Sequence, residues 1–439
     1  MAADGDKVRL ACVGVGNRGA GIISEFAATG QANIVALCDV DLGAEHTRKT
    51  LATFPAARQF QDFRKMFDAM DADLDAVAIA VPDHAHFPIA MAALTLNKHV
   101  YLEKPMTRTF YEAELLMAAA RERPRLATQV GNQGHSEANY FQFKAWQEAG
   151  IISDITAITA HMNSGRLWHK LDPRMTRPPA AEPPPTTLDW DAWLSASAFR
   201  DYNRLYHYGE WRGWYDFGMG ALGDWGAHIL DTAHEFLQLG LPAEITPLTL
   251  TGRNDYIFPQ ASTLQFKFPA RDAMPPLTVT WHDGVNNFPM LPKGYGAVKP
   301  DPAVPPTADG HYKPLRLNPG KILHGKNLAF RGGTHGGTLT IIPEDRARDL
   351  KASLPEIPPS PSNHYKNFLR ACRGEEKTRS PFEIHGTLSQ TFSLGVIAQR
   401  LNAPLMFNPV TKRITNHRVA DALLTGLPPR RGWGQYYRW

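Results

Sequence analysis

The sequence predicts an α/β protein in which a doubly wound parallel sheet is followed by a second α/β domain built on a large, open, mostly antiparallel sheet. Two observations lead to this class: strand and helix patterns alternate from residue 8 to residue 130, and several short alternating strands follow after residue 150. At 439 residues the chain is also too long for one ordinary core. We therefore expect one domain over residues 1–132 and another over residues 133–439.

A glycine-rich turn joins the first predicted strand to the first predicted helix. The strand covers residues 8–13, the turn reads Gly14-Val15-Gly16-Asn17-Arg18-Gly19, and a second strand over 34–38 ends at Asp39. Such glycine spacing is common by itself. Its place between a strand and a helix, with an acid about twenty residues further on, is typical of a dinucleotide-binding Rossmann domain. A glycine-rich turn in another kind of α/β protein is the alternative.

The residue types in this turn suit a dinucleotide. Gly14 makes a tight turn, Gly16 lets the backbone approach a pyrophosphate, and Gly19 allows the helix to pack closely on the strand. The N-terminus of the helix offers unpaired N–H groups to phosphates. The Asp39 carboxylate would accept hydrogen bonds from the ribose hydroxyls and repel a 2′-phosphate, so we expect NAD rather than NADP.

Further candidates follow the later strands of this domain. The alternation continues with helices over 63–69, 88–96 and 111–121 and strands over 76–81, 99–102 and 126–130. Ligands of doubly wound sheets bind beyond the carboxyl ends of the strands. Lys104, between a strand end and Pro105, is therefore a catalytic candidate, with a solvated loop lysine as the alternative. The predicted cofactor-binding residues are Gly14, Gly16, Asn17, Arg18, Gly19, Asp39, Pro82, His84, Glu103, Lys104, Asn132 and Gln133.

The start of the second domain is rich in aromatic residues. A helix is predicted over 137–149 and a strand over 155–162, and a proline-rich, irregular stretch over 172–187 follows. Tryptophan and tyrosine rings are typical of walls that bind sugars, but they are equally typical of a large core. The predicted substrate-binding residues are His161, Asn163, Arg166, Trp168, Trp211, Arg212, Trp214 and Tyr215.

The stretch from Gly218 to Asp231 combines small residues with an acid and a histidine. Asp224 and His228 are four residues apart, and on a helix this spacing places them on one face, where Asp224 could hold the imidazole in one orientation. Taken alone, such a pair is more typical of a helix end than of an active site. We expect no metal here, although the stretch offers a geometric alternative site made of Asp224, His228, Asp231 and His234.

The rest of the second domain completes the predicted sheet. Strands are predicted over 248–251, 263–268, 277–282 and 338–342 and helices over 363–373 and 388–402. Two insertions are expected, near 163–215 and 284–335. The basic, aromatic tail over 430–439 is expected to dock on the same or a neighbouring subunit.

Composition narrows the function classes. The net charge is +4, and the 47 lysines and arginines are dispersed, which argues against a nucleic-acid protein. No apolar run is long enough for a membrane span. Cys12, Cys38 and Cys372 fall in predicted strands and a helix and indicate buried free thiols. The polar N-terminus indicates a cytoplasmic protein, or a periplasmic one from which an export signal has been removed.

The order of these motifs resembles the glucose–fructose oxidoreductase / inositol dehydrogenase (Gfo/Idh/MocA) family from residue 8 to about residue 407. Lys104 matches that family's Glu-Lys-Pro lysine, and Asp224 with His228 matches its Asp-x-x-x-His pair. The resemblance implies a tightly held NAD(P), a carbohydrate substrate and a homo-oligomer, either a dimer or a tetramer, with no nucleic-acid or membrane partner. The two insertions and the tail depart from the family pattern and leave the sugar open.

The predicted activity is hydride transfer between a nicotinamide cofactor and a hydroxyl of a sugar or glycoside, with C3 of a pyranose as the favoured position. His228 would remove the hydroxyl proton, Asp224 would fix the imidazole tautomer, and Lys104 would stabilise negative charge on the reacting oxygen. His228 and Lys104 could exchange roles. One alternative is a glycosidase that oxidises C3 transiently, eliminates the aglycone, adds water and reduces the ring again. Another is a non-catalytic NAD-binding protein.

Overall fold

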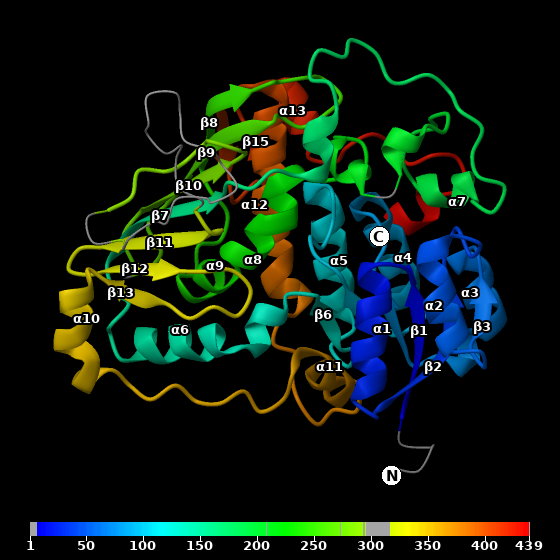
Figure 1. Ribbon diagram of the computed structural model, residues 1–439, viewed down its shortest axis with the longest axis horizontal. Coiled ribbons are helices and arrows are strands. Elements are labelled where there is room, and N and C mark those ends of the chain that lie inside the picture. Colours follow the sequence, from blue (N-terminus) through cyan, green and yellow to red (C-terminus); the bar gives the residue numbers. More distant parts are fainter. Residues whose placement is uncertain (1–6, 208, 273, 293–294, 296–316, 439) are drawn as a thin grey trace, which may run out of the picture.

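The computed structural model describes residues 7–207, 209–272, 274–292, 295 and 317–438 (Figure 1). Two domains lie side by side. The strands of the N-terminal sheet are blue to cyan, and most strands of the second sheet are green or yellow. The middle of the predicted insertion over 284–335 lies outside the described residues.

The N-terminal sheet is parallel throughout and has the strand order of a Rossmann domain, β3-β2-β1-β4-β5-β6. The strands are β1 Val8–Val13, β2 Ala32–Cys38, β3 Arg58–Phe60, β4 Ala76–Ile79, β5 His99–Leu102 and β6 Thr128–Val130. The predicted doubly wound sheet is therefore confirmed. Every residue of β4 is buried, which explains its continuous apolar sequence. β3 is missing from the predicted strands because Arg-Gln-Phe carries no apolar pattern.

Helices cover both faces of this sheet. They are α1 Arg18–Ala28, α2 Glu45–Thr53, α3 Phe63–Met70, α4 Asp83–Thr95, α5 Phe110–Glu122 and, from much later in the chain, α11 His364–Cys372. Phe26 of α1 packs edge-on against Tyr365 and Phe368 of α11 at ring distances of 5.1 and 5.9 Å. On the other face α3, α4 and α5 contribute to a separate apolar cluster.

The second sheet has the order β13-β12-β11-β7-β10-β9-β8-β14-β15. Its strands are β7 Ile155–Met162, β8 Glu244–Thr251, β9 Ala261–Phe268, β10 Leu277–Asp283, β11 Gly320–Gly325, β12 Ala329–Gly332, β13 Thr340–Ile342, β14 Leu405–Asn408 and β15 Arg413–Ile414. All pairs except β7 with β10 are antiparallel, which confirms the predicted mostly antiparallel sheet. β11 and β12 lie in the stretch predicted as an insertion, and their Leu323 and Phe330 are core residues.

A long helix, α12 (Phe382–Leu401), lies between the two domains (Figure 1). Phe382 packs into the N-terminal core, Ser389 Oγ accepts the N–H of Met106 at 3.0 Å, and Phe392 belongs to the core of the second domain. This helix therefore ties the end of β5 to the second sheet. The remaining helices are α6 Ala138–Glu148, α7 Trp190–Leu194, α8 Ala227–Ile229, α9 Asp231–Phe236, α10 Glu344–Leu350 and α13 Arg418–Leu423.

The insertion over 163–215 crosses back over the N-terminal domain. The N–H of Asp189 donates to the carbonyl oxygen of Val40 at 2.8 Å, and Gln61 Nε2 donates to that of Thr187 at 2.7 Å. These bonds place α7 over the carboxyl end of β2. The insertion thus closes the space above the Rossmann strands.

The C-terminal tail docks on its own chain. Trp433 is buried, and its ring lies 5.9 Å from that of Phe63 in α3. Arg430 Nε donates to the carbonyl oxygen of Ser195, just after α7, at 2.9 Å. In Figure 1 the red tail runs beside α4 and α7. Of the two predicted docking places, the same subunit is the one observed.

The three cysteines are free thiols. Cys12 and Cys38 are buried and Cys372 is half-buried. Burial raises the pKa of each thiol, so these groups stay protonated and unreactive. Among the described helices, none combines the length and apolarity needed to cross a membrane.

Candidate active site

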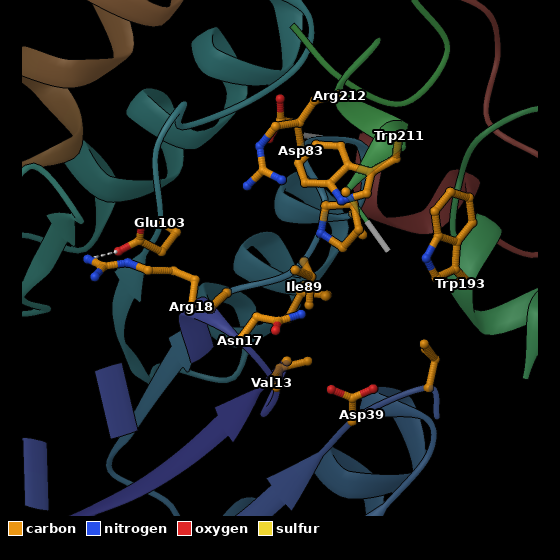
Figure 2. A pocket seen from close by; sticks show the side chains of 18 of the residues that line it. Val13, Asn17, Arg18, Asp39, Asp83, Ile89, Glu103, Trp193, Trp211 and Arg212 are labelled. Carbon is orange, nitrogen blue, oxygen red and sulfur yellow. Dashed lines mark hydrogen bonds and ion pairs between the residues drawn. The ribbon is translucent and has the colours of Figure 1, made fainter. Parts of the chain in front are cut away.

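A cavity of about 680 Å³ opens at the carboxyl ends of β1, β2, β4 and β5 and is covered by the insertion over 163–215 (Figure 2). Figure 2 shows Asn17 and Asp39 on the Rossmann side, whereas Trp193 and Trp211 face them from the insertion. The same cavity reaches His228 in the second domain. One continuous cavity therefore joins the predicted cofactor residues to the predicted catalytic residues.

The turn after β1 requires glycine at two of its residues, and the absence of side chains there lets a pyrophosphate approach the backbone. Gly14 has a φ of 82°, and a Cβ at this residue would lie 2.3 Å from the carbonyl oxygen of Ala80. A Cβ at Gly19 would lie 1.9 Å from the carbonyl oxygen of Gly14. Helix α1 begins at Arg18, within this glycine-rich turn, and Arg18 lines the cavity. Its N-terminal N–H groups are therefore available to a phosphate.

Asp39 faces the cavity from the end of β2 (Figure 2). Its carboxylate accepts the N–H of Val15 at 2.9 Å and that of Asp41 at 3.0 Å. Burial raises the pKa of this carboxyl, and the two backbone N–H bonds oppose that effect. The N–H bonds fix its orientation, so the remaining lone pairs suit the hydroxyls of a ribose. The residues present thus fit a dinucleotide.

Lys104 and Asp224 meet at the other end of the cavity. Lys104 Nζ donates to the Asp224 carboxylate at 2.9 Å and to the Asp224 carbonyl oxygen at 2.8 Å. Arg166 also donates to this carboxylate, and Arg212 Nε lies 3.5 Å from it. Burial disfavours the charge on Asp224. The three cations outweigh burial and hold the pKa of its carboxyl well below its usual range.

His228 stacks on a second histidine, His335, which is absent from the predicted site residues. The two ring centroids are 3.9 Å apart with an interplanar angle of 21°, and the N–H of His335 donates to the carbonyl oxygen of His228 at 3.2 Å. Burial, followed by Lys104 and His335, holds the pKa of His228 well below its ordinary value. The sequence feature that could have pointed to His335 is the glycine-flanked run Gly-Gly-Thr-His-Gly-Gly, in which His335 adopts a φ of 56°.

Asp224 does not orient His228, contrary to the prediction. Residues Leu222–Gly226 form a π-helix, whose turns are wider than those of an α-helix, and the Asp224 carboxylate points to Lys104. Within the described part of the chain, His228 Nδ1 has no hydrogen-bond partner. The prediction used only the spacing of Asp224 and His228 along an assumed α-helix. It could not include Lys104, Arg166 and Arg212, which other segments of the chain bring to Asp224.

The cavity is lined by most of the predicted site residues, namely Gly14, Gly16, Asn17, Arg18, Asp39, Pro82, Glu103, Lys104, Gln133, Arg166, Trp211, Arg212, Asp224 and His228. Arg18 and Glu103 form an ion pair at 3.0 Å across its wall (Figure 2). Lining residues that are absent from the predicted site include His46, Asp83, Trp193, Trp225 and His335. Asp83 is buried, and burial raises the pKa of its carboxyl to about 7.

The other predicted residues lie outside the cavity: Gly19, His84, Asn132, His161, Asn163, Trp168, Trp214 and Tyr215. Two of them support its walls. His84 Nε2 contacts the carbonyl oxygen of Trp193 at 2.7 Å, and Asn132 Nδ2 donates to that of Ala227 at 2.6 Å. His161 is buried in β7, between β10 and β11.

The aromatic residues divide between wall and core. Trp214 and Tyr215 are buried, and Tyr215 packs on Phe258 with ring centroids 4.2 Å apart. Trp168 is also buried, but its ring lies 5.1 Å from the guanidinium carbon of Arg166. These rings therefore pack behind the site and do not line its cavity. The sequence could not separate them from the wall residues, because tryptophan and tyrosine occur in both places.

The alternative metal site is not assembled. His234 Nε2 contacts the carbonyl oxygen of Gly240 at 2.9 Å, whereas Asp224 is held by Lys104. Across the described residues, no group of three or more histidine, cysteine, aspartate and glutamate side chains gathers as a metal site would require.

Curated relatives are similar to part of this chain. Inositol 2-dehydrogenase of Salmonella typhimurium is 28% identical over 147 residues, which are 33% of this chain and 43% of that protein. A glycosyl hydrolase family 109 protein of Shewanella amazonensis is 34% identical over 111 residues, which are 24% of each chain. The chain therefore matches less than half of the length of these relatives.

Solved structures share the fold over most of the chain. The WlbA dehydrogenase of Bordetella pertussis, in complex with NADH and UDP-GlcNAcA, has a TM-score of 0.59 at 15% identity and covers 92% of this chain and 99% of its own. The aldose–aldose oxidoreductase of Caulobacter crescentus has a TM-score of 0.57 at 15% identity, with 91% and 100% covered.

Two stretches of the sequence match one oxidoreductase family. Residues 8–131 match its NAD-binding Rossmann fold, and residues 142–245 match its C-terminal α/β domain. The matched stretches contain the dinucleotide turn, Lys104 and the pair Asp224 and His228. The chain belongs to the Gfo/Idh/MocA oxidoreductase family.

Proposed function

We propose that this protein is an NAD-dependent oxidoreductase that transfers a hydride between a nicotinamide and a hydroxyl of a sugar or glycoside, with C3 of a pyranose as the favoured position. The observation that carries the proposal is the single cavity that joins Gly14 and Asp39 to Lys104 and His228. Relatives named inositol 2-dehydrogenase and aldose–aldose oxidoreductase support a carbohydrate substrate.

The residues around the Gly14 turn would hold the cofactor. Asp39 favours NAD over NADP because its half-buried carboxylate, which faces the cavity, would repel a 2′-phosphate. Tight retention is supported by the insertion, whose Trp193 and Trp211 cover the cavity. The chemistry that NAD supplies when bound is acceptance or donation of a hydride at its nicotinamide ring.

His228 and Lys104 would manage the proton and the charge on the reacting oxygen. A neutral imidazole can accept the hydroxyl proton, and the low pKa of His228 keeps it neutral. Lys104 Nζ would donate to the oxygen on which negative charge develops. Asp224 holds that ammonium at 2.9 Å, so its role is to position Lys104 rather than His228.

A glycosidase that uses NAD without net oxidation is the second candidate. Two observations favour it: the similarity to the family 109 glycosyl hydrolase protein, and a covered cavity that suits a cofactor which stays bound through many turnovers. In this activity the same His228 and Lys104 would serve a transient oxidation at C3.

One experiment separates the two activities. The purified protein is incubated with a nitrophenyl glycoside without added NAD, and both aglycone release and NADH absorbance are recorded. NADH formation with an intact glycoside after NAD is added supports the oxidoreductase. Aglycone release over many turnovers without NADH supports the glycosidase. If a panel of sugars and glycosides gives neither product, both proposals are wrong.

A further inference from the structure

Three cations converge on one carboxylate at the reaction end of the cavity. Lys104, Arg166 and Arg212 all contact Asp224, and the three come from separate segments of the chain. One carboxylate balances one of these charges. The other cationic side chain in this wall, Arg18, is already paired with Glu103 at 3.0 Å.

Asp83 does not restore the balance near neutral pH. It lies close to Arg212 in Figure 2, but its side chain is buried, and its Oδ2 accepts the N–H of Met219 at 3.1 Å. Burial raises the pKa of its carboxyl to about 7, so a large share of this group is protonated at neutral pH. The described residues around Asp224 therefore carry an excess of positive charge.

The two arginines are held in place by aromatic rings. The Arg212 guanidinium lies 4.1 Å from the ring of Trp211, and that of Arg166 lies 5.1 and 5.4 Å from the rings of Trp168 and Trp225. Such stacking keeps the guanidinium planes fixed while their edges stay free to donate. These aromatic residues thus orient the cations that line the cavity.

Arg166 also has unused hydrogen-bonding capacity. Its Nε is buried and has no partner among the described residues, and its side chain is only 21% exposed. A buried donor without an acceptor is unfavourable, and an arginine fork matches the two oxygens of a carboxylate or a phosphate. Because Nε itself is buried, a ligand in the cavity would reach the exposed part of this guanidinium, where an anionic group would offset the excess charge.

We propose that the substrate is an anionic sugar whose carboxylate or phosphate group binds Arg166 and Arg212 while its reacting hydroxyl lies at Lys104 and His228. This inference rests on the proposed oxidoreductase function and names its substrate class. A neutral sugar would leave the excess positive charge around Asp224 without a counter-charge. Carboxylate and phosphate share the required chemistry, and the choice of substrates separates them.

The test compares matched sugars that differ only in one group. Glucose, galactose and mannose are each assayed beside the corresponding uronate and 6-phosphate, with the NAD-loaded protein, for kcat/KM. One charge-assisted contact corresponds to a preference of about tenfold or more. We expect at least that preference for one anionic series. We expect it to shrink in Arg166→Gln and Arg212→Gln and to persist in the control Arg174→Gln, whose side chain is 88% exposed in the same insertion.

Each outcome bears on one proposal or on both. If neutral sugars react as well as both anionic series, the anionic substrate is excluded and the oxidoreductase proposal stands. If no sugar is oxidised, calorimetric titration of the NAD-loaded protein with the same uronates and phosphates decides. Binding that weakens in the two arginine variants supports the anion site and contradicts the activity. No binding overturns the anionic substrate as well.

Discussion

The two ends of the cavity are built in different ways. At the dinucleotide end, the turn and the ribose acid come from one continuous stretch, Gly14 to Asp39, and the turn depends on backbone shape. The reaction end gathers side chains from several distant segments, with Lys104, Asp224 and His335 as examples. A bound phosphate can be recognised by N–H groups that any sequence supplies, whereas proton transfer requires particular side chains. The dinucleotide end can therefore be recognised from a short stretch of sequence, whereas the reaction end is assembled only when the chain folds.

The largest expected effect tests the reaction end. Lys104→Ala and His228→Ala should each lower turnover by about a hundredfold or more, the usual scale for a group that moves a proton or stabilises charge. The measurement is NADH formation under saturating substrate. Lys98→Ala is the control because Lys98 pairs with Asp71 outside the cavity at 2.8 Å. Turnover near that of the unmodified protein in either cavity variant would contradict the assigned roles.

A backbone change tests the dinucleotide end. Gly14→Ala should lower NAD affinity by about tenfold or more, because its Cβ would lie 2.3 Å from a carbonyl oxygen and the positive φ costs about 1–2 kcal/mol. Equilibrium titration with NAD measures the loss. Gly240→Ala is a matched control, since Gly240 also has a positive φ, 63°, but open space around it. If both variants bind NAD equally well, close backbone approach at Gly14 is not what this end depends on.

This difference also decides what the sequence could predict. The turn, Asp39 and the parallel strands were predictable because strand, turn and helix patterns are local. The partner of Asp224 was not, because Lys104 lies 120 residues away and reaches it only through the packing of two domains. Trp211 and Trp214 look alike in sequence and both are buried, yet Trp211 lines the cavity and Trp214 does not. β11 and β12 were not predicted because they lie in a glycine-rich stretch. They form because they pair with each other and because β11 also pairs with β7.

A smaller effect is expected at His335. His335→Gln should lower turnover by about tenfold, because the stacked ring fixes the plane of His228 at 3.9 Å. It should also move the acid limb of the pH–rate profile to higher pH. In this variant the effect of His335, which lowers the pKa of His228, is lost, so that pKa rises. The lowering effects of Lys104 and Arg18 and the raising effect of Asp224 remain. An unchanged profile would limit His335 to packing.

The smallest expected effect concerns Asp83, at the boundary between the two ends. Its pKa of about 7 in the folded protein lies above its ordinary value of 3.8, so the folded state holds its proton more tightly. The stability from this group is full below the ordinary value and is lost as pH rises through 7. Asp83→Asn cannot titrate, so its melting temperature relative to the unmodified protein should rise by about 2 °C between pH 5 and pH 8.

The Asp83 comparison also bears on the positive charge around Asp224. The matched variant Asp283→Asn removes another buried carboxyl of raised pKa, in the second sheet, where Ser262 Oγ and Trp281 Nε1 both donate to it. These two donors share Oδ2, and the Ser262 N–H donates to Oδ1 at 3.1 Å. Because an amide has only one oxygen, the variant leaves at least one of these donors without an acceptor and should be destabilised at every pH. A melting difference for Asp83→Asn that stays flat from pH 5 to pH 8 would mean that Asp83 is ionised throughout. Its charge would then offset Arg212 and reduce, without abolishing, the excess of positive charge that favours an anionic sugar at the reaction end.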